Sequence, residues 1–239
     1  MGFSYAGRDF GSLVGCELVE PVAPAVAPVT AAVPGRAGAL LLGCELPPLT
    51  LTVRLYLDAG AQLDERELAS VHRTIRGWLA PGAADGADLT VDGEPGLTWR
   101  GAVLTGASDW SDLFEAAWCE LEFTCMDPVA YGEERTSPEA TFTVGGTWET
   151  RPVVGLTAEA GGAVEVADAA GRSVRVERAF AAGDAVVIDC GHETVSVNGA
   201  AADADVVLGS DFLALAPGAC ELSFTGCSAH TVTWTERWV

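Results

Sequence analysis

The sequence predicts a mainly β protein with two domains: an N-terminal antiparallel β-sandwich-like domain with one packed helix, and a C-terminal β-sandwich. Short runs in which apolar and polar residues alternate recur along most of the chain, and this is the pattern of half-buried strands. Only the segment from Asp64 to Leu79 has the helical period. A polar stretch that begins with Gly132 and ends with Pro138 separates the two sets of strands.

Length and composition are consistent with this organisation. The 239 residues suffice for two domains, and with 49% hydrophobic and 20% charged residues each can bury a core. No apolar run reaches the roughly 18 residues of a membrane span, so we expect no membrane insertion. No secretory signal is visible at the N-terminus, which predicts folding in the cytoplasm. Seven cysteines, an odd number, then favour reduced thiols over a disulfide framework.

The charge balance is strongly acidic. Thirty-four Asp and Glu face 13 basic residues, all of them Arg, and the net charge is −21. Because nucleic-acid affinity comes mainly from Lys and Arg that neutralise phosphates, we expect no specific nucleic-acid binding.

The N-terminal domain opens with two short predicted strands, around Phe3–Tyr5 and Val14–Leu18. Three prolines between Pro21 and Pro28 then favour extended polyproline backbone and exclude an interior sheet position. We therefore expect a long arm or loop there, of the kind that commonly makes contacts. It ends in a turn at Pro34-Gly35.

Next comes the clearest strand, Leu49 to Leu57, with leucines and Val53 on one face. In the following helix Asp64 and Glu67 have the spacing of a capping box, and Pro81-Gly82 ends it. The apolar face of this helix comprises Leu68, Val71, Ile75 and Trp78.

The rest of this domain reads as a hairpin over residues 89–104, a loop at 109–112 and a strand that ends at Phe123–Cys125 before Pro128. We interpret the polar run Glu133–Pro138 as a solvated connector, which gives domains 1–135 and 136–239.

Ten short alternating runs separated by turn residues make up the second domain, at the spacing of a β-sandwich. The predicted strands are Phe142–Val144, Val153–Leu156, Val164–Val166, Val174–Val176, Val186–Ile188, Val195–Val197, Val206–Leu208, Leu213–Leu215, Leu222–Phe224 and Val232–Trp234.

Catalytic and metal-binding patterns are weak. The sequence has no nucleophile elbow, zinc-protease helix, P-loop or dinucleotide fingerprint, and only three histidines, so we expect no enzyme activity and no cofactor. The pairs Asp109/Asp112 and Asp203/Asp205 lie in predicted turns, where Asp caps backbone donors more often than it binds calcium. His72, on the helix, is better explained as a partly buried residue than as a base.

The most metal-like group lacks the tight Cys-x-x-Cys pair of zinc sites, so we interpret its thiols as small core residues. Its members are Cys190, His192, Cys220, Cys227 and His230.

Sugar binding is the main alternative function. β-Sandwiches stack sugars on exposed aromatic rings, and Trp148, Trp234 and Trp238 are available. The His-x-Asn-x-Arg strand of galectins is absent, and core tryptophans are the more common explanation.

Several motifs, in order, resemble the distal tail protein of siphovirus-like phages, the phage tail component family. They are Phe3–Gly7, Val33–Gly38, Asp92–Gly96, the Phe-x-Cys-x-Asp-Pro-x-x-Tyr-Gly pattern from Phe123 to Gly132, and Leu215–Gly218. The resemblance implies that the second domain is galectin-like. It also implies a structural role at the tail tip of a phage or prophage virion.

By the same resemblance, residues 1–135 form a homohexameric ring that leaves a channel for DNA. The ring joins the tail tube protein above to a host-contacting tip protein below. Pro34, Gly35, Arg36 and Gly38 are candidate contacts with another subunit or with the tube. An Arg-lined channel would bind the passing DNA, so we expect Arg36, Arg54, Arg73 and Arg76 to pair with carboxylates at sheet, helix or subunit contacts.

Overall fold

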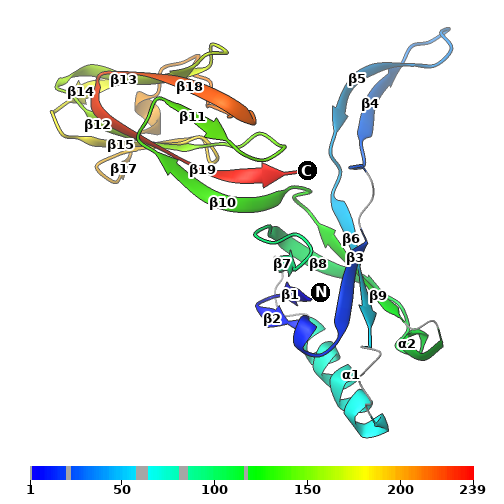
Figure 1. Ribbon diagram of the computed structural model, residues 1–239. Coiled ribbons are helices and arrows are strands. Elements are labelled where there is room, and N and C mark those ends of the chain that lie inside the picture. Colours follow the sequence, from blue (N-terminus) through cyan, green and yellow to red (C-terminus); the bar gives the residue numbers. More distant parts are fainter. Residues whose placement is uncertain (1, 20–22, 58–63, 81–85, 116–117) are drawn as a thin grey trace. The chain divides into compact units, whose positions relative to one another are not determined.

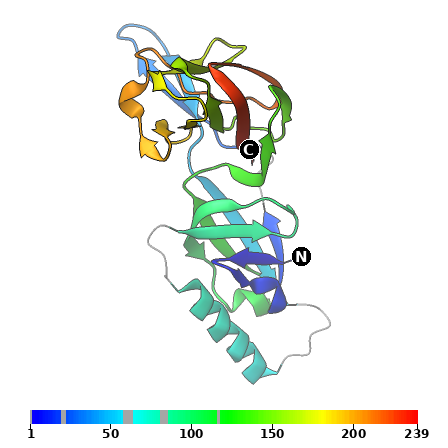
Figure 2. The ribbon, with the colours of Figure 1, turned by 90° about the vertical axis from the view of Figure 1, so that its left-hand side faces the viewer.

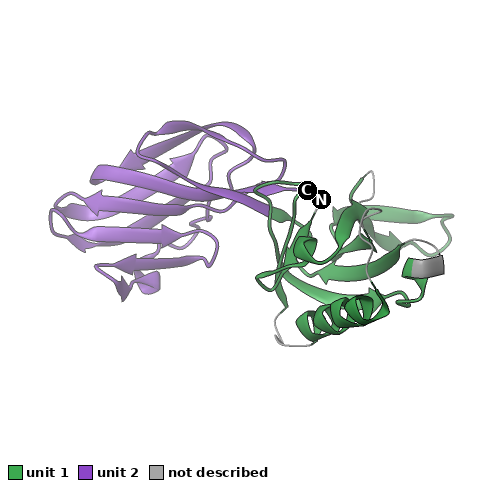
Figure 3. Ribbon diagram, turned by 60° about the horizontal axis from the view of Figure 1, so that its bottom comes forward, with its two compact units in different colours: residues 1–130, 239 green, residues 131–238 purple. Residues whose placement is uncertain are grey.

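The computed structural model describes residues 2–19, 23–57, 64–80, 86–115 and 118–239 (Figure 1). The chain divides into two compact units, here called unit 1, residues 1–130 with Val239, and unit 2, residues 131–238 (Figure 3). Strands predominate in both units, which confirms the predicted mainly β fold. In the described part of the chain no helix is long and apolar enough to cross a membrane.

The core of unit 1 is a seven-stranded sheet in the order β2-β1-β7-β8-β9-β6-β3, and its neighbouring strands are antiparallel. The strands are β1 Phe3–Tyr5, β2 Arg8–Asp9, β3 Gly15–Val19, β6 Leu49–Tyr56, β7 Ala87–Val91, β8 Trp99–Ala107 and β9 Cys119–Cys125. On the central pair, Leu51 lies opposite Phe123 and Val53 opposite Leu121, and all four side chains are buried. The apolar alternation seen in the sequence is therefore the core face of this sheet.

Helix α1, Glu65–Leu79, packs on that core beside the short 3-10 segment η1, Phe10–Ser12 (Figure 2). Ile75 is buried, and the Trp78 ring meets Phe10 edge to face at 5.2 Å. The predicted capping box is confirmed: Asp64 Oδ1 accepts from the backbone N–H of Glu67 at 2.8 Å, and Glu67 Oε2 accepts from the Asp64 N–H at 2.9 Å. The predicted stop at Pro81-Gly82 lies outside the described residues.

Unit 2 is a two-sheet sandwich, as the sequence predicts. The larger sheet contains β10 Ala130–Ser137, β19 Cys227–Trp238, β12 Val153–Ala158, β15 Ala185–Asp189, β16 Thr194–Val197 and β17 Ala200–Ala201, in that order. The smaller contains β11 Thr141–Val144, β18 Gly218–Thr225, β13 Gly161–Asp168 and β14 Ser173–Phe180. Valines from both sheets fill the core, and Phe142 of β11 stacks on Trp234 of β19 with ring centroids 4.6 Å apart.

Three expectations need correction. The polar run after Gly132 is not a connector, because β10 continues to Ser137 as the outermost strand of the larger sheet. An edge strand needs pairing on one side only, so exposed Glu and Arg are suited to it. The two compact units divide between Ala130 and Tyr131.

Residues 206–208 and 213–215 are not strands; each segment makes a single bridge, Val206 with Val176 and Leu215 with Thr150. Leu213 and Leu215 are buried but do not pair with a neighbouring strand, so the alternation of apolar residues here indicates burial and not a strand. The predicted loop at 109–112 also contains the start of a short second helix, α2 Asp112–Glu115.

We predict that Phe123→Ala lowers the free energy of unfolding of unit 1 by about 3–5 kcal/mol, because a fully buried ring is replaced by a cavity. Phe123 is 0% exposed and contacts Tyr5 at 4.8 Å between ring centroids. Met126→Ala is the control, since Met126 is 61% exposed near the end of the same strand. Calorimetry on both variants tests this, and equal melting of the two would contradict the packing described here.

Candidate functional site

Unit 1 carries a largely exposed two-stranded hairpin, which we call the arm: β4 Ala27–Ala32, β5 Ala39–Glu45 and the turn between them (Figure 1). Its strands are antiparallel, with Ala27 opposite Glu45 and Ala32 opposite Ala39. The sequence predicted a long arm or loop over Pro21–Pro28, which overlaps the arm only at the start of β4, and it missed both strands. Pro28 fits within β4 because both edges of a lone hairpin are open, where a missing N–H costs no ladder bond.

All four candidate contact residues, Pro34, Gly35, Arg36 and Gly38, lie in the turn at the tip of the arm, and all are exposed. The turn closes with a hydrogen bond from the Arg36 N–H to the Val33 carbonyl at 3.1 Å. Gly35 and Gly38 have φ of 77° and 83°, a backbone region that residues other than glycine rarely adopt. The two glycines thus allow the backbone to turn at the tip, where the side chains of Pro34 and Arg36 are exposed.

Apolar side chains of the arm face solvent. Leu41 is 64% exposed, Leu42 67% and Leu40 39%, and among the described residues none of the arm's side chains belongs to either hydrophobic core. An isolated two-stranded hairpin is only marginally stable in water. This arm therefore has the properties of a surface that another chain covers.

At the base of the arm lies a groove of about 460 Å³, lined mainly by apolar residues of unit 1. Among them are Pro24, Leu46, Pro47, Leu49 and Pro128. The arm and this groove are thus two different apolar surfaces on the same unit.

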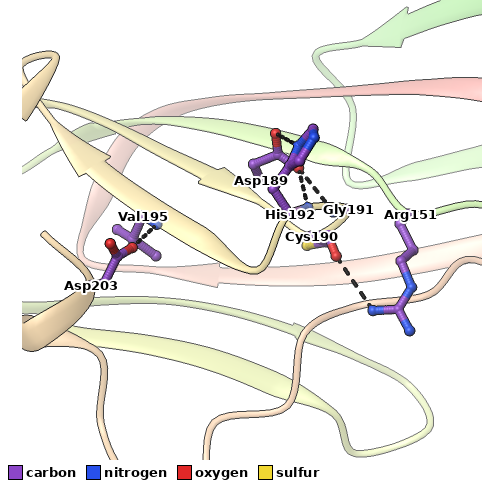
Figure 4. A network of polar contacts seen from close by, with 7 residues as sticks. All are labelled: Arg151, Asp189, Cys190, Gly191, His192, Val195 and Asp203. Carbon is purple, nitrogen blue, oxygen red and sulfur yellow. Dashed lines mark hydrogen bonds and ion pairs between the residues drawn. The ribbon is translucent and has the colours of Figure 1, made fainter. Parts of the chain in front are cut away.

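In unit 2 two carboxylates hold turns together, Asp189 and Asp203, and the sequence had singled out only the second (Figure 4). Asp189 Oδ1 accepts from the backbone N–H groups of Gly191 and His192, both at 2.9 Å, and Asp189 Oδ2 lies 2.8 Å from His192 Nδ1. Burial acts to raise the pKa of Asp189, but the hydrogen bonds from His192 and Gly191 outweigh it and leave the pKa below its ordinary value. Asp203 likewise accepts from the Val195 N–H at 2.6 Å.

The metal-like cluster does not assemble. Cys190 is fully buried, whereas the His192 side chain next to it is 82% exposed and points away from it (Figure 4). His230 stacks on Phe224, with ring centroids 3.8 Å apart. Within the described ranges no group of three or more His, Cys, Asp or Glu is arranged to hold a metal ion.

Two of the tryptophans considered for sugar stacking differ in burial. Trp234 is 5% exposed and belongs to the sandwich core, while Trp238, at 36%, is near the surface.

On unit 1, His72 stacks on Trp110 at 4.4 Å, and burial together with the charge of Arg76 lowers its pKa. The expectation that His72 is a partly buried residue is confirmed.

All seven cysteines are free thiols, and only Cys44, on the arm, is exposed. Burial raises the pKa of Cys16, Cys119 and Cys190 to about 11 and that of Cys125 to about 12. A thiol with so high a pKa carries almost no reactive thiolate at neutral pH.

We predict that one thiol per native chain reacts rapidly with a disulfide reagent at pH 7 and that this thiol is Cys44. Cys44→Ser should abolish the fast phase, whereas Cys190→Ser should leave it unchanged. Elemental analysis should find no stoichiometric zinc. A fast phase that survives Cys44→Ser would show that a core thiol is accessible.

Comparison with known proteins identifies the class. Residues 145–238, which lie in unit 2, match the family model described as the siphovirus-type tail component, C-terminal domain. The whole chain shares its fold with SPP1 Dit (gp 19.1), whose crystal structure superposes with a TM-score of 0.78 at 19% identity, over 100% of this chain and 99% of that one. The predicted resemblance to the phage tail component family is thereby confirmed.

Two structures of the phage P2 baseplate in its activated conformation, with Ca and with Sr, also align. Each covers 92% of this chain and 90% of its own, at 8% identity and a TM-score of 0.42. No curated protein matches the chain. The matched family is one of tail components, not of enzymes.

Proposed function

We propose that this chain is a distal tail protein, a non-enzymatic component of a phage or prophage tail tip that assembles into a homohexameric ring. The observation that carries the proposal is the arm, a hairpin with two open edges and exposed leucines, which are the features of a surface that another chain covers. The similar fold of SPP1 Dit, a protein described as a paradigm of the hub adsorption apparatus in phages that infect Gram-positive bacteria, supports the placement at the tail tip.

The geometry of unit 1 also favours a ring over a dimer. An arm of one copy that lies on the groove of the next would join two different surfaces of the same chain, and such heterologous contacts generate rings when they close. Six copies would carry 6 × −21 = −126, a charge that repels DNA passing through the centre. The tail tube protein would bind above this ring and the tip protein below it.

We assign ring formation to unit 1 and regard unit 2, the predicted galectin-like sandwich, as an appendage. Each unit has a separate hydrophobic core, which is the condition for folding alone. Folding in the host cytoplasm precedes incorporation into the virion. The first test is the mass of the purified chain in solution, with negative-stain images to reveal a central hole.

We predict that Leu41→Asp with Leu42→Asp abolishes assembly and leaves a folded monomer, because charges replace the apolar surface that the next copy covers. Leu208→Asp is the matched control: Leu208 is fully exposed in unit 2, so the same change there should leave the mass of the assembly unchanged. Light scattering measures both. Intact rings from the arm variant would show that the arm is not an assembly surface.

A chain that ends at residue 130 should still form rings, because the cut removes all but the first residue of β10 and spares the sheet of unit 1. The cut is placed at residue 130 and not at 135 because β10, Ala130–Ser137, pairs with β19 in unit 2. If the shortened chain is folded but monomeric at concentrations where the whole chain assembles, the roles of the two units are wrongly assigned.

A further inference from the structure

The solvent-facing side of α1 carries three arginines, Arg66, Arg73 and Arg76, and all three are exposed. At 3.6 residues per turn, Arg66 and Arg73 lie about 20° apart around the helix axis, and Arg76 lies about 60° from Arg73 and about 80° from Arg66. The opposite side of the helix packs on the core through Ile75 and Trp78. We call the outer side the arginine face of α1.

Within the described residues, these guanidinium groups have no bonded partner. Six other arginines form ion pairs, and Arg54 pairs with Glu120 at 2.9 Å as expected. The remaining five are Arg135, Arg151, Arg172, Arg175 and Arg178. Among the described residues, no ion pair, hydrogen bond or ring contact is formed by the guanidinium groups of Arg66, Arg73 or Arg76. The expected pairing of Arg73 and Arg76 with carboxylates is therefore not satisfied inside one copy.

The residues between these arginines are small. Ala69, Ser70 and Gly77 fill the arginine face, and the carboxylate of Glu67 is already bonded to the Asp64 N–H. Glycine inside a helix is destabilising relative to alanine. Yet a Cβ added at Gly77 would have nothing within 4 Å, so nothing in the described part of the chain requires glycine there. A close neighbour outside the chain would.

We infer that the arginine face of α1 docks on an acidic surface of a second copy of this chain. The occupant must be anionic to satisfy three guanidiniums, and the chain itself is the anionic surface at hand, with 34 acidic and 13 basic residues. Guanidinium forks pair with carboxylates through two hydrogen bonds, which fixes orientation as well as charge. This inference rests on the proposed ring, where a second copy is always adjacent.

A nucleic-acid partner fits these observations less well. Three arginines would neutralise about as many phosphates, which is a weak contact, and the net charge of −21 around them repels a polyanion. In contact with a neighbouring copy the same field is favourable, since the arginine face is a local positive patch in a negative surface. Nucleic-acid binding is consequently an outcome that the experiment must distinguish.

The test compares Arg73→Glu with Arg8→Glu in the full chain. Arg8, on β2, is exposed and takes the same change of charge away from α1. Arg73→Glu should lower the association constant per contact by about tenfold or more, because it sets like charges against each other, and the double change with Arg66→Glu should lower it further. Arg8→Glu should leave it near the wild-type value, and circular dichroism should confirm that all variants are folded.

Gly77→Ala provides a second readout of opposite sign. It should raise the thermal midpoint of the monomer by a few degrees, because alanine is the better helix former, and yet weaken association, because the added methyl group obstructs the neighbour. A residue with a merely structural role would not separate these two effects.

Three results would overturn the inference. Equal association constants for Arg73→Glu and Arg8→Glu would remove α1 from the interface and leave the arm contacts as the basis of the ring. If the wild-type chain binds a 20-base-pair DNA duplex and the double change Arg66→Glu with Arg73→Glu abolishes this binding, the arginine face is a nucleic-acid site. A wild-type chain that stays monomeric at high concentration would overturn the proposed ring and this contact together.

Discussion

The aromatic cluster of unit 1 is the interaction on which the rest of that unit depends. Phe3 stacks on Phe10 with ring centroids 4.4 Å apart, Phe10 meets Trp78 of α1, and Phe3 also approaches Phe123 of β9 at 6.2 Å. One cluster thereby ties the N-terminal strand, the central sheet and the helix together. Since Trp78 and Ile75 hold one side of α1 against this cluster, the arginines on the other side must face outward.

That core leaves two surfaces of different chemistry uncovered. The arm has exposed leucines and open backbone edges, and the arginine face has charges that form no ion pair with any other described residue. Within one chain the first costs stability because apolar area stays in water, while the second costs little because an exposed guanidinium is well hydrated. The arm is thus the surface that most strongly requires a partner, whereas the arginine face selects which partner fits and in which orientation.

The sequence predicted much of the fold because most of its strands are buried on one face, and burial appears as alternation. Leu51, Val53 and Leu55 of β6 show it clearly, as do the valines of the sandwich. It predicted less where burial does not alternate. The strands of the arm have no buried side at all, so only prolines and glycines marked them, and β10 was taken for a connector because its exposed Glu and Arg side chains look the same in a loop.

The candidate site was harder to find for a related reason. Turn chemistry marked Pro34-Gly35, whereas only the family resemblance suggested Pro34, Gly35, Arg36 and Gly38 as contact residues. These four residues lie in one turn, at the arm's tip. The exposed leucines beside them looked like any core strand in the sequence, since exposure is a property of the folded chain. The unpaired state of Arg73 is equally invisible before folding, because it depends on which carboxylates the sheet brings near and which it does not.

The two surfaces also respond oppositely to salt. Ion pairs at the arginine face weaken as salt screens them, with a Debye length of about 8 Å at physiological ionic strength. Apolar contact at the arm survives screening, and salt also reduces the repulsion between copies that each carry −21. If both contacts operate, assembly at low salt is limited by repulsion between whole subunits and at high salt by the loss of guanidinium pairs. An optimum between these limits is what distinguishes a mixed interface from one made by the arm alone.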